Sequence, residues 1–370
     1  MFIIKQFLKM LLQHMVLPVI YTFWRIVYCR KEPQLIVFAD AHHETFPYSM
    51  KNMYDALTKK GCSVVTEIHD YSKVSQLKSF CLAARFMKIY AQAKVVFICD
   101  NFFPVVSCNK SKKTKVVQLW HSCGLLKKMG YDTEEDIPKY YLGNVYKNYD
   151  LVTVSAPACE EHLTRAMRQK EGVVKALGVS RTDTYYDQKW IDFCKSQFYE
   201  AYPEAEGKKV ILWAPTFRGN AGDPYQVGTE AIMQLEKELG EKYFVIRKVH
   251  PHIENRYHLS NCSIPSEQLF PVADLMITDY SSIVFDYLFF KKPYILFAPD
   301  MEEYLDKRGF YVEYESLCPY VITEEEKLKE NVLSVLNGQN EDWIQQQYDF
   351  HISSCDGHVT ERILAYLALD

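Results

Sequence analysis

From residue 34 onward, short runs of β-branched and apolar residues alternate with longer stretches in which apolar residues recur at helical spacing. The runs that we expect to form strands in the first half lie at residues 35–38, 63–65, 95–98, 116–119 and 151–154. An amphipathic stretch over residues 49–60, ended by Gly61, predicts a helix between the first two of these strands. Strands separated by helices are typical of βαβ units, so this half predicts a mostly parallel sheet covered by helices.

The alternation stops over residues 186–208, where a helical stretch is followed by a polar segment with Pro and Gly, and then it begins again. In the second half we expect strands at residues 210–214, 243–247, 275–278 and 294–297, and helices at residues 229–239 and from Ser281. The pattern therefore predicts an N-terminal domain over residues 34–190 and a C-terminal domain over residues 205–370. In α/β domains of this kind, ligands bind at the carboxyl ends of the strands.

The composition supports this organisation and excludes several classes of protein. The length of 370 residues exceeds the roughly 250–300 residues that a single core supports. Apolar residues make up 48% and charged residues 24%, which excludes a mostly disordered or collagen-like chain. The formal net charge of −4 disfavours a nucleic-acid binder that works through a global positive field. The 11 cysteines form no Cys-x-x-Cys pair, so we expect a reducing compartment and no cysteine metal site.

The N-terminus has an unusual charge pattern, because its first 31 residues hold cations and no acidic residue around an uncharged stretch at residues 10–24. The cations are Lys5, Lys9, Arg25, Arg30 and Lys31. A spanning helix needs about 20 apolar residues, so this stretch is too short to cross a bilayer. We predict that residues 1–33 form a helical segment that lies on an anionic membrane surface. The alternative is a core helix of the first domain.

His121 is the first candidate for chemistry, because it follows the strand that ends at Leu119 and should lie at the ligand-binding edge of the sheet. A histidine in this position can act as a general base. The alternative is a structural histidine bonded to a backbone carbonyl. Two cations, Lys127 and Lys128, follow shortly afterwards and favour a phosphorylated substrate.

Two further candidates follow strands of the second half. Arg218 comes after the strand at residues 210–214 and precedes a glycine-containing loop. Its planar guanidinium could bind phosphate oxygens, although a surface arginine fits the pattern as well. Lys248 and His250 follow the strand at residues 243–247 and predict a second phosphate contact. His250 and His252 could instead hold a metal ion, but such a site needs further ligands, so phosphate binding is the favoured interpretation.

The fourth candidate is a pair of serines, Ser281 and Ser282, which follow the strand at residues 275–278 and open the next predicted helix. Free N–H groups at a helix N-terminus together with two hydroxyls would form an anion site. A plain N-cap would explain one serine but not the pair. Asp286 lies about one turn into this helix, where it could reach a ribose hydroxyl if the phosphates of a nucleotide lie on the serines.

Taken together and in this order, the four blocks resemble the CDP-glycerol glycerophosphotransferase family of wall teichoic acid synthesis. The similarity covers most of residues 34–370, and it includes residues 100–103, 177–183 and 307–309 and Asp356-Gly357-His358 with Arg362. Within the family, the short chain, its N-terminal segment and residues 114–128 look most like the teichoic-acid primase. Ser122 and Cys123 stand where family members often have Gly and Thr, and Ser180 stands where they often have Pro.

The resemblance implies a GT-B architecture, in which two Rossmann-like domains face a central cleft and the C-terminal domain holds the CDP-glycerol donor. It implies that His121 is the base and that His250 is a catalytic residue that contacts phosphate. The implied donor-binding residues are Thr216, Arg218, Lys248, Thr278, Asp279, Ser281, Ser282 and Asp286, and the implied acceptor-binding residues are Asn101, Lys127 and Lys128. The chain has no Asp-x-Asp metal motif, so we expect side chains to meet the phosphate charge, with no metal ion and no cofactor.

We therefore predict a peripheral enzyme at the cytoplasmic face of the cell membrane. It would transfer glycerol phosphate from CDP-glycerol to a hydroxyl of an undecaprenyl-diphosphate-linked sugar, the priming step of wall teichoic acid synthesis, and release CMP. A poly(glycerol phosphate) polymerase and a CDP-ribitol-dependent enzyme are alternatives with the same phosphate motifs. A nucleotide-sugar epimerase of the same fold and a catalytically inactive adaptor are the alternatives from other classes.

Overall fold

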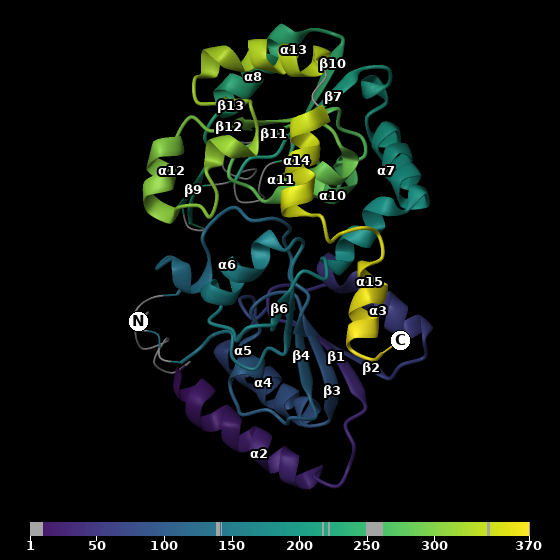
Figure 1. Cartoon of the computed structure of the whole chain (residues 1–370), viewed down its shortest axis with the longest axis vertical. Helices are drawn as coiled ribbons and strands as arrows, with labels where there is room; N and C mark the ends of the chain where they lie inside the picture. Colours follow the sequence, from purple (N-terminus) through teal and green to yellow (C-terminus); the bar gives the residue numbers. More distant parts are fainter. Residues whose placement is uncertain are drawn as a thin grey trace. The chain divides into compact units, whose positions relative to one another are not determined.

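The computed structural model describes residues 10–137, 141, 143–216, 218–220, 223–248, 262–338 and 341–369. The chain divides into two compact units, whose helices and strands are labelled in Figure 1. Unit 1 comprises residues 1–122, 129–183 and 354–370, and unit 2 comprises residues 123–128 and 184–353. Each unit is built around a parallel sheet, which confirms the predicted α/β class.

The sheet of unit 1 has the strand order β2-β1-β3-β4-β5-β6, and its strands pair in parallel. Its strands are β1 (Leu35–Asp40), β2 (Val64–Ile68), β3 (Ala93–Ile98), β4 (Lys115–Gln118), β5 (Leu151–Thr153) and β6 (Val174–Lys175). The accompanying helices are α2 (Leu17–Val27), α3 (Tyr48–Lys59), α4 (Gln76–Tyr90), α5 (Phe103–Val106), α6 (Ala158–Ala166) and α15 (Val359–Tyr366), with short turns η1 (Leu12–Val16), η2 (Gly130–Asp132) and η3 (Ser180–Tyr186). Strands β1, β3 and β4 are buried along nearly their whole length, which explains their continuous apolar runs.

Unit 2 repeats this plan with the strand order β10-β7-β11-β12-β13, again in parallel. Its strands are β7 (Lys209–Trp213), β10 (Tyr243–Arg247), β11 (Leu275–Thr278), β12 (Tyr294–Phe297) and β13 (Val321–Ile322), with an antiparallel hairpin of β8 (Arg218–Asn220) and β9 (Asp223–Tyr225). The helices are α7 (Gln188–Ala201), α8 (Thr229–Leu239), α10 (Ser266–Leu269), α11 (Ile283–Tyr287), α12 (Met301–Arg308), α13 (Leu328–Asn337) and α14 (Glu341–His351), with η4 (Pro203–Ala205), η5 (Leu288–Phe290), η6 (Tyr314–Leu317) and η7 (Glu325–Lys327). Its core packs side chains of α8 and α13, such as Ile232 and Val332, against strand residues such as Ile211 and Ile277.

Hydrophobic spacing determines which face each helix buries. In α3, the side chains of Met50, Met53 and Leu57 are buried and recur at helical spacing, so they form the stripe that packs on the unit. Helix α4 begins after Ser75, whose hydroxyl accepts the N–H of Lys78 at 3.3 Å and satisfies one donor of the first turn. The predicted positions of the strands and of the helix at residues 49–60 are confirmed, whereas α4 was not among the predicted helices.

The strand order places a topological switch point in each sheet. In unit 1 the chain continues from β1 to β2 on one side, while β3 lies on the other side of β1. In unit 2 the same reversal occurs at β7, which has β10 on one side and β11 on the other. Ligands of open α/β sheets bind beyond the carboxyl ends of the strands at such points. The candidate residues that follow these strands therefore lie where the topology favours a ligand.

The C-terminal segment, residues 354–370, belongs to unit 1, although the sequence predicts it in the C-terminal domain. The carboxylate of Asp183 holds it there, because its two oxygens accept the N–H groups of Val359 at 2.9 Å and Thr360 at 2.7 Å at the start of α15. A carboxylate at a helix N-terminus supplies both a cap and a favourable charge. This contact joins residues far apart in the sequence, and hydrophobic periodicity does not reveal it.

Residues 123–128, which follow His121, belong to unit 2, although the sequence predicts them in the N-terminal domain. The N–H of Leu125 donates to Nδ1 of His351 at 3.2 Å, and the N–H of Lys128 donates to the carbonyl of Gly309 at 3.1 Å. Burial lowers the pKa of His351 to about 3, so the ring stays neutral and its Nδ1 remains an acceptor. Helix α7 belongs to unit 2 as well, so the main junction lies before it.

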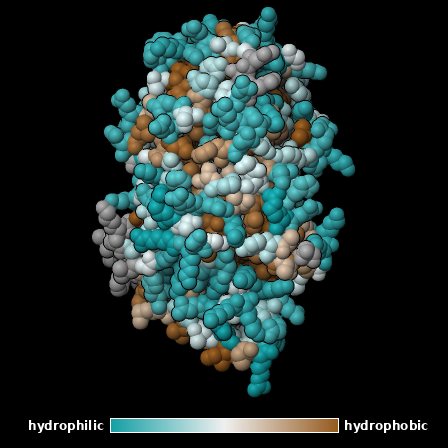
Figure 2. All heavy atoms as spheres, viewed as in Figure 1, coloured by the Kyte–Doolittle hydropathy of each residue, from teal (hydrophilic) through white to brown (hydrophobic). Residues whose placement is uncertain are grey.

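Helix α2 has one buried side and one exposed side, both of them apolar. Leu17 and Tyr21 are buried, and the Tyr21 hydroxyl accepts the N–H of Ser111 at 2.9 Å. On the other side, Val19 is 68% exposed and Phe23 is 57% exposed. Figure 2 shows hydrophobic atoms at the bottom of the view, where Figure 1 shows α2 in the same orientation. Among the described residues, no helix combines the length and the apolar character needed to cross a bilayer.

We predict that Gly178→Ala destabilises unit 1 much more than Gly172→Ala does. Both glycines have positive φ, so both substitutions strain the backbone by about 1 kcal/mol. A Cβ at Gly178 would also lie 2.4 Å from Val359 Cγ2 and 2.6 Å from the Ser354 carbonyl oxygen, whereas a Cβ at Gly172 meets nothing within 4 Å. The expected additional loss is about 2 kcal/mol in the free energy of unfolding, measured in urea. Equal losses for the two variants would contradict this packing.

Candidate active site

The backbone around His121 is fixed on both sides of the residue. His121 follows β4, and the preceding Trp120 has a φ of +60°, a conformation that is uncommon outside glycine. The side chain of Gln118 holds this turn, because its amide oxygen accepts the Trp120 N–H at 3.1 Å and its amide nitrogen donates to the Asp100 carbonyl at 3.2 Å. The carbonyl of His121 in turn accepts a hydrogen bond from Arg181 Nη2 at 3.2 Å. His121 is therefore held at the carboxyl edge of the sheet.

The ring of His121 has a defined tautomer. Its Nδ1 lies 2.9 Å from the carbonyl oxygen of Cys99, and a carbonyl can only accept, so Nδ1 carries the hydrogen. In the neutral ring, Nε2 is then an acceptor. The side chain is 44% exposed, and the carboxylate of Asp100 lies 3.8 Å from Nδ1. This arrangement lets Nε2 take a proton from a bound hydroxyl while a carboxylate stands beside the cation that forms.

A second polar cluster follows β1, and the sequence analysis did not identify it. One carboxylate oxygen of Asp40 accepts the N–H groups of His42 at 2.7 Å and His43 at 2.8 Å, and it lies 2.9 Å from His43 Nδ1. Nε2 of His42 donates to the carbonyl of Asn101 at 3.0 Å. The signal in the sequence was three polar residues directly after a strand at the switch point. Among the described residues, no group of three His, Cys, Asp or Glu side chains is arranged to hold a metal ion.

The three predicted acceptor residues belong to different units. Asn101 is exposed at the carboxyl edge of unit 1, and its side-chain oxygen lies 3.5 Å from the Tyr149 hydroxyl. Lys127 and Lys128 lie in unit 2, where Lys127 pairs with Phe310 in a β-bridge. Their role in acceptor binding stays a prediction.

In unit 2, the guanidinium of Arg218 is buried among carboxylates. Nε lies 2.7 Å from Asp300 Oδ2, and Nη2 lies 2.9 Å from Asp279 Oδ2. Nη1 donates to the carbonyl of Thr216 at 2.6 Å. The guanidinium carbon also lies 4.8 Å from the centre of the Tyr280 ring. The fork that the sequence predicts to be available for phosphate is therefore engaged within the protein, and Arg218 lies in a hairpin strand instead of a flexible loop.

The charges of this cluster oppose the effect of burial on its three members to different extents. Burial raises the pKa of Asp279, and the Arg218 charge and the Thr216 N–H offset this only in part. Burial favours the neutral form of Arg218, but the carboxylates of Asp300 and Asp279 raise its pKa above the usual value. Burial likewise opposes ionisation of Asp300, but the hydrogen bond and the charge of Arg218 lower the pKa of that carboxyl. The donors of the guanidinium are engaged by Asp300, Asp279 and the Thr216 carbonyl, so phosphate must contact other groups.

Three of the other predicted donor residues have structural partners. The Thr216 N–H donates to Asp279 at 2.8 Å, and the Thr278 hydroxyl donates to the Ala214 carbonyl at 2.7 Å. Asp286 is buried and accepts a hydrogen bond from the Tyr185 hydroxyl at 3.2 Å, in place of the predicted ribose hydroxyl.

The remaining predicted donor residues are half-buried at the carboxyl edge of unit 2. Lys248 Nζ donates to the Cys262 carbonyl at 2.7 Å. The Ser281 hydroxyl lies 3.4 Å from the Ile283 N–H, and Ser282 directly precedes α11. Because α11 has five residues, its dipole is small. His250 lies outside the described residues.

A protein-family model described as CDP-glycerol:poly(glycerophosphate) glycerophosphotransferase matches residues 21–369. The chain belongs to this family. A glycerophosphotransferase-family relative, the teichoic acid ribitol-phosphate primase of Bacillus spizizenii strain W23, is 32% identical over 75% of this chain and 75% of its own length. The teichoic acid glycerol-phosphate primase of Bacillus subtilis strain 168 is 33% identical over 60% of this chain and 61% of its own length.

A longer relative and two solved structures are also similar to this chain. The teichoic acid poly(ribitol-phosphate) polymerase of Bacillus spizizenii strain W23 is 30% identical over 89% of this chain, but the match spans 55% of that polymerase. The solved wall teichoic acid polymerase TagF has a TM-score of 0.73 at 23% identity, covering 99% of this chain and 97% of that chain. A putative UDP-N-acetylglucosamine 2-epimerase from Listeria monocytogenes has a TM-score of 0.57 at 13% identity, covering 91% of this chain and 96% of that chain. At these identities, the two structures show the fold alone.

We predict that Arg218→Met destabilises unit 2 by about 3–5 kcal/mol, because it removes the counter-charge of the buried Asp279 and the half-buried Asp300. The charged Asp300 stabilises the fold at any pH above the ordinary Asp pKa. This contribution is lost as the pH falls through the lowered pKa of Asp300 in the folded state. The defect should therefore shrink in acid. Urea unfolding at several pH values measures it.

The matched control is Arg165→Met, which removes an ion pair with Asp132 at 3.1 Å from a side chain that is 54% exposed. We expect a loss below about 1 kcal/mol from this variant. An Arg218→Met protein as stable as the control would show that the buried cluster does not hold unit 2 together.

Proposed function

We propose that the protein transfers glycerol phosphate from CDP-glycerol to a hydroxyl of an undecaprenyl-diphosphate-linked sugar and releases CMP, and that its two units act as the halves of a GT-B enzyme. The observation that carries the proposal is the acceptor nitrogen of His121 at the carboxyl edge of a parallel sheet. It stands in a chain that belongs to the glycerophosphotransferase family over residues 21–369.

In the proposed reaction, the acceptor hydroxyl attacks the phosphorus that carries glycerol. A new oxygen–phosphorus bond forms, and the bond from that phosphorus to the bridging oxygen of the diphosphate breaks, so CMP leaves with the electron pair. The hydroxyl proton passes to Nε2 of His121. The hydrogen bond from Nδ1 to the Cys99 carbonyl orients the ring, and the Asp100 carboxylate favours the imidazolium that forms.

In this proposal, phosphate binding on the donor side comes from Lys248, Ser281, Ser282 and His250. Lys248 carries a positive charge at the carboxyl edge, and the serines present hydroxyls at the start of α11. Arg218 acts as a positioning residue: it fixes Asp279, which in turn accepts the Thr216 N–H. The cluster thus keeps the ends of β7 and β11 in place for the donor.

A CDP-ribitol-dependent transferase is the second candidate. The observation that favours it is the ribitol-phosphate primase relative, whose match covers 75% of this chain, compared with 60% for the glycerol-phosphate primase of Bacillus subtilis. The two donors share the CDP group and differ in the alditol, so the phosphate-binding residues are the same in both proposals.

The proposal includes peripheral attachment of the protein to the cytoplasmic face of the membrane through α2. Its exposed side carries Val19, Phe23 and Ile26, while Leu17 and Tyr21 attach the other side to unit 1. No acidic residue occurs in the first 31 residues of the chain, and Arg25, Arg30 and Lys31 can meet anionic headgroups. Apolar side chains flanked by cations are typical of helices that lie in the membrane interface.

We predict that the wild-type protein releases CMP from CDP-glycerol when a defined undecaprenyl-diphosphate-linked disaccharide is present. His121→Asn should lower kcat by about 10²–10⁴-fold with little change in the KM for donor, because the amide can donate to the Cys99 carbonyl but cannot take the proton. His162→Asn on α6 of the same unit is the control and should retain activity.

Three outcomes would change this proposal. CMP release with CDP-ribitol alone would favour the second candidate. No release with either donor on any lipid acceptor would contradict the transferase. Near-normal kcat in a folded His121→Asn protein would remove His121 from the role of base.

We predict that Val19→Asp combined with Phe23→Asp releases the protein from anionic vesicles while both units stay folded, because both side chains are exposed. Cosedimentation with phosphatidylglycerol vesicles measures this, and circular dichroism checks the fold. The control is Leu77→Asp combined with Phe193→Asp, which changes two exposed apolar residues outside α2. Equal binding of both double variants would contradict attachment through α2.

A further inference from the structure

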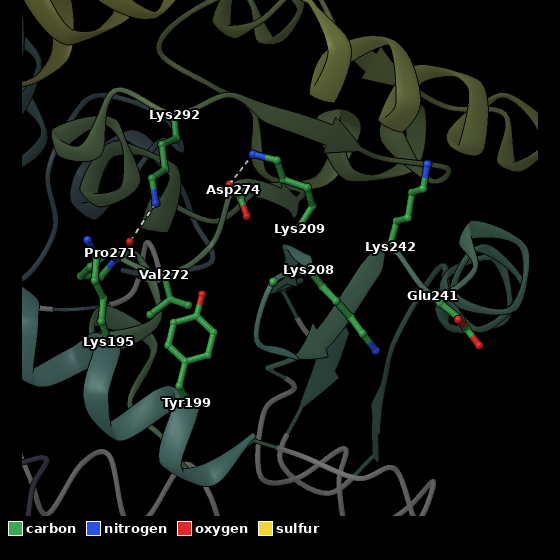
Figure 3. A pocket seen from close by; sticks show the side chains of 11 residues that line it. Lys195, Tyr199, Lys208, Lys209, Glu241, Lys242, Pro271, Val272, Asp274 and Lys292 are labelled. Atoms are coloured by element: carbon green, nitrogen blue, oxygen red, sulfur yellow. Dashed lines mark hydrogen bonds and ion pairs between the residues drawn. The ribbon is translucent and has the colours of Figure 1, made fainter. Parts of the chain in front are cut away.

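The amino edge of the unit 2 sheet carries an unusual concentration of lysines. Four adjacent strands, β10, β7, β11 and β12, begin at this edge. Lys242 precedes β10, Lys209 begins β7, Asp274 precedes β11, and Lys292 lies just before β12. Together with Lys195 and Tyr199 of α7 they line an open basin of about 900 Å³, shown in Figure 3. We call this feature the amino-edge basin.

Hydrogen bonds hold two of these lysines in place. Lys209 Nζ lies 3.0 Å from Asp274 Oδ1, and the other oxygen of Asp274 accepts the Val210 N–H at 2.8 Å. Lys292 Nζ donates to the carbonyls of Pro271 at 2.8 Å and Ala273 at 2.7 Å. Figure 3 shows Lys209 turned toward Asp274 and Lys292 turned toward Pro271. The basin is thus formed by strand ends and loop carbonyls, and hydrogen bonds fix two of its lysines.

The positive charge of the basin is not balanced. Five of the residues that line it are lysines, and two are carboxylates, Glu241 and Asp274. Burial lowers the pKa of Lys292 to about 8; the Asp274 charge opposes this shift, and the charges of Lys195 and Lys209 add to it. Cations that are held close together and partly removed from water destabilise one another unless an anion joins them.

The basin is distinct from the candidate active site. Strand β7 has five residues and spans about 16 Å at the usual rise per residue. Arg218, Asp279 and Thr216 lie beyond the carboxyl ends of β7 and β11, and the basin lies at the amino ends of the same strands. A ligand in the basin therefore cannot be the reacting diphosphate of a donor bound at the carboxyl edge.

We infer that the amino-edge basin binds a polyol-phosphate chain through several of its phosphodiester groups, an inference that rests on the proposed function because each transfer in that reaction forms one phosphodiester of this kind. The concave shape suits a flexible chain better than a flat bilayer. The lysines are spread across three strand spacings, about 14 Å, which exceeds the reach of a single phosphate. The Tyr199 side chain at the rim can pack against the carbon backbone of the polyol.

The test measures binding of a fluorescently labelled oligo(glycerol phosphate) of defined length to the full-length protein by anisotropy. Lys195→Gln combined with Lys209→Gln should raise the Kd about tenfold, the effect expected for two exposed charge contacts. The matched control is Lys189→Gln combined with Lys237→Gln, which removes the same charge from exposed lysines elsewhere on α7 and α8. The control should bind as the wild type does, and added salt should weaken wild-type binding.

Each of four results would overturn the inference. The first is no binding of the oligomer to the wild type, and the second is an equal loss in both double variants, which indicates a diffuse effect of net charge. The third is competition by inorganic phosphate as strong as that by the oligomer at equal phosphate concentration, which indicates a site for one anion. The fourth is a defect of the Lys195/Lys209 variant in binding to phosphatidylglycerol vesicles, with oligomer binding unchanged. CMP release is assayed on the same proteins, so failure of the transferase proposal is seen separately.

Discussion

The buried guanidinium of Arg218 constrains the whole carboxyl edge of unit 2. It connects the β8-β9 hairpin to Asp279 at the end of β11, to Asp300 at the start of α12 and to the Thr216 carbonyl. A charge removed from water destabilises the fold unless its partners stay in contact, so none of these segments can shift alone. Because its donors are engaged by these partners, the guanidinium fixes the carboxyl edge, and the proposed phosphate contacts fall to Lys248 and the serines.

In unit 1, hydrogen bonds instead of a buried ion pair fix the backbone and the ring of His121. Gln118, the Cys99 carbonyl and the Arg181 hydrogen bond to the His121 carbonyl set the backbone and the ring. The neutral Cys99 carbonyl orients the ring through Nδ1, which suits the proposed transfer of a proton to Nε2. The Asp100 carboxylate 3.8 Å from Nδ1 belongs to a partly exposed pair, unlike the buried pair of Arg218 and Asp279.

The sequence predicted what depends on local pattern and missed what depends on distant contacts. Strands such as β3 and β11 follow directly from apolar runs bounded by polar residues. The position of His121 at a strand end was predictable for the same reason. The partners of Arg218 and Asp286 were not, because Asp300 and Tyr185 lie 82 and 101 residues away. The C-terminal residues 354–370 show the same limit. The Asp183 carboxylate binds the start of α15 and places this segment in unit 1.

The parallel arrangement of the unit 2 sheet gathers charged residues at its two edges. All its strands start at one edge and end at the other, so residues before strands gather at one place and residues after strands at another. Lys209, Lys242 and Lys292 stand at or before strand starts, while Asp279 and Asp300 follow strand ends. A chain with a net charge of −4 therefore builds a local positive field at the amino edge. Because salt screens such fields over about 10 Å and β7 spans about 16 Å, the charges at one edge have little effect on the other.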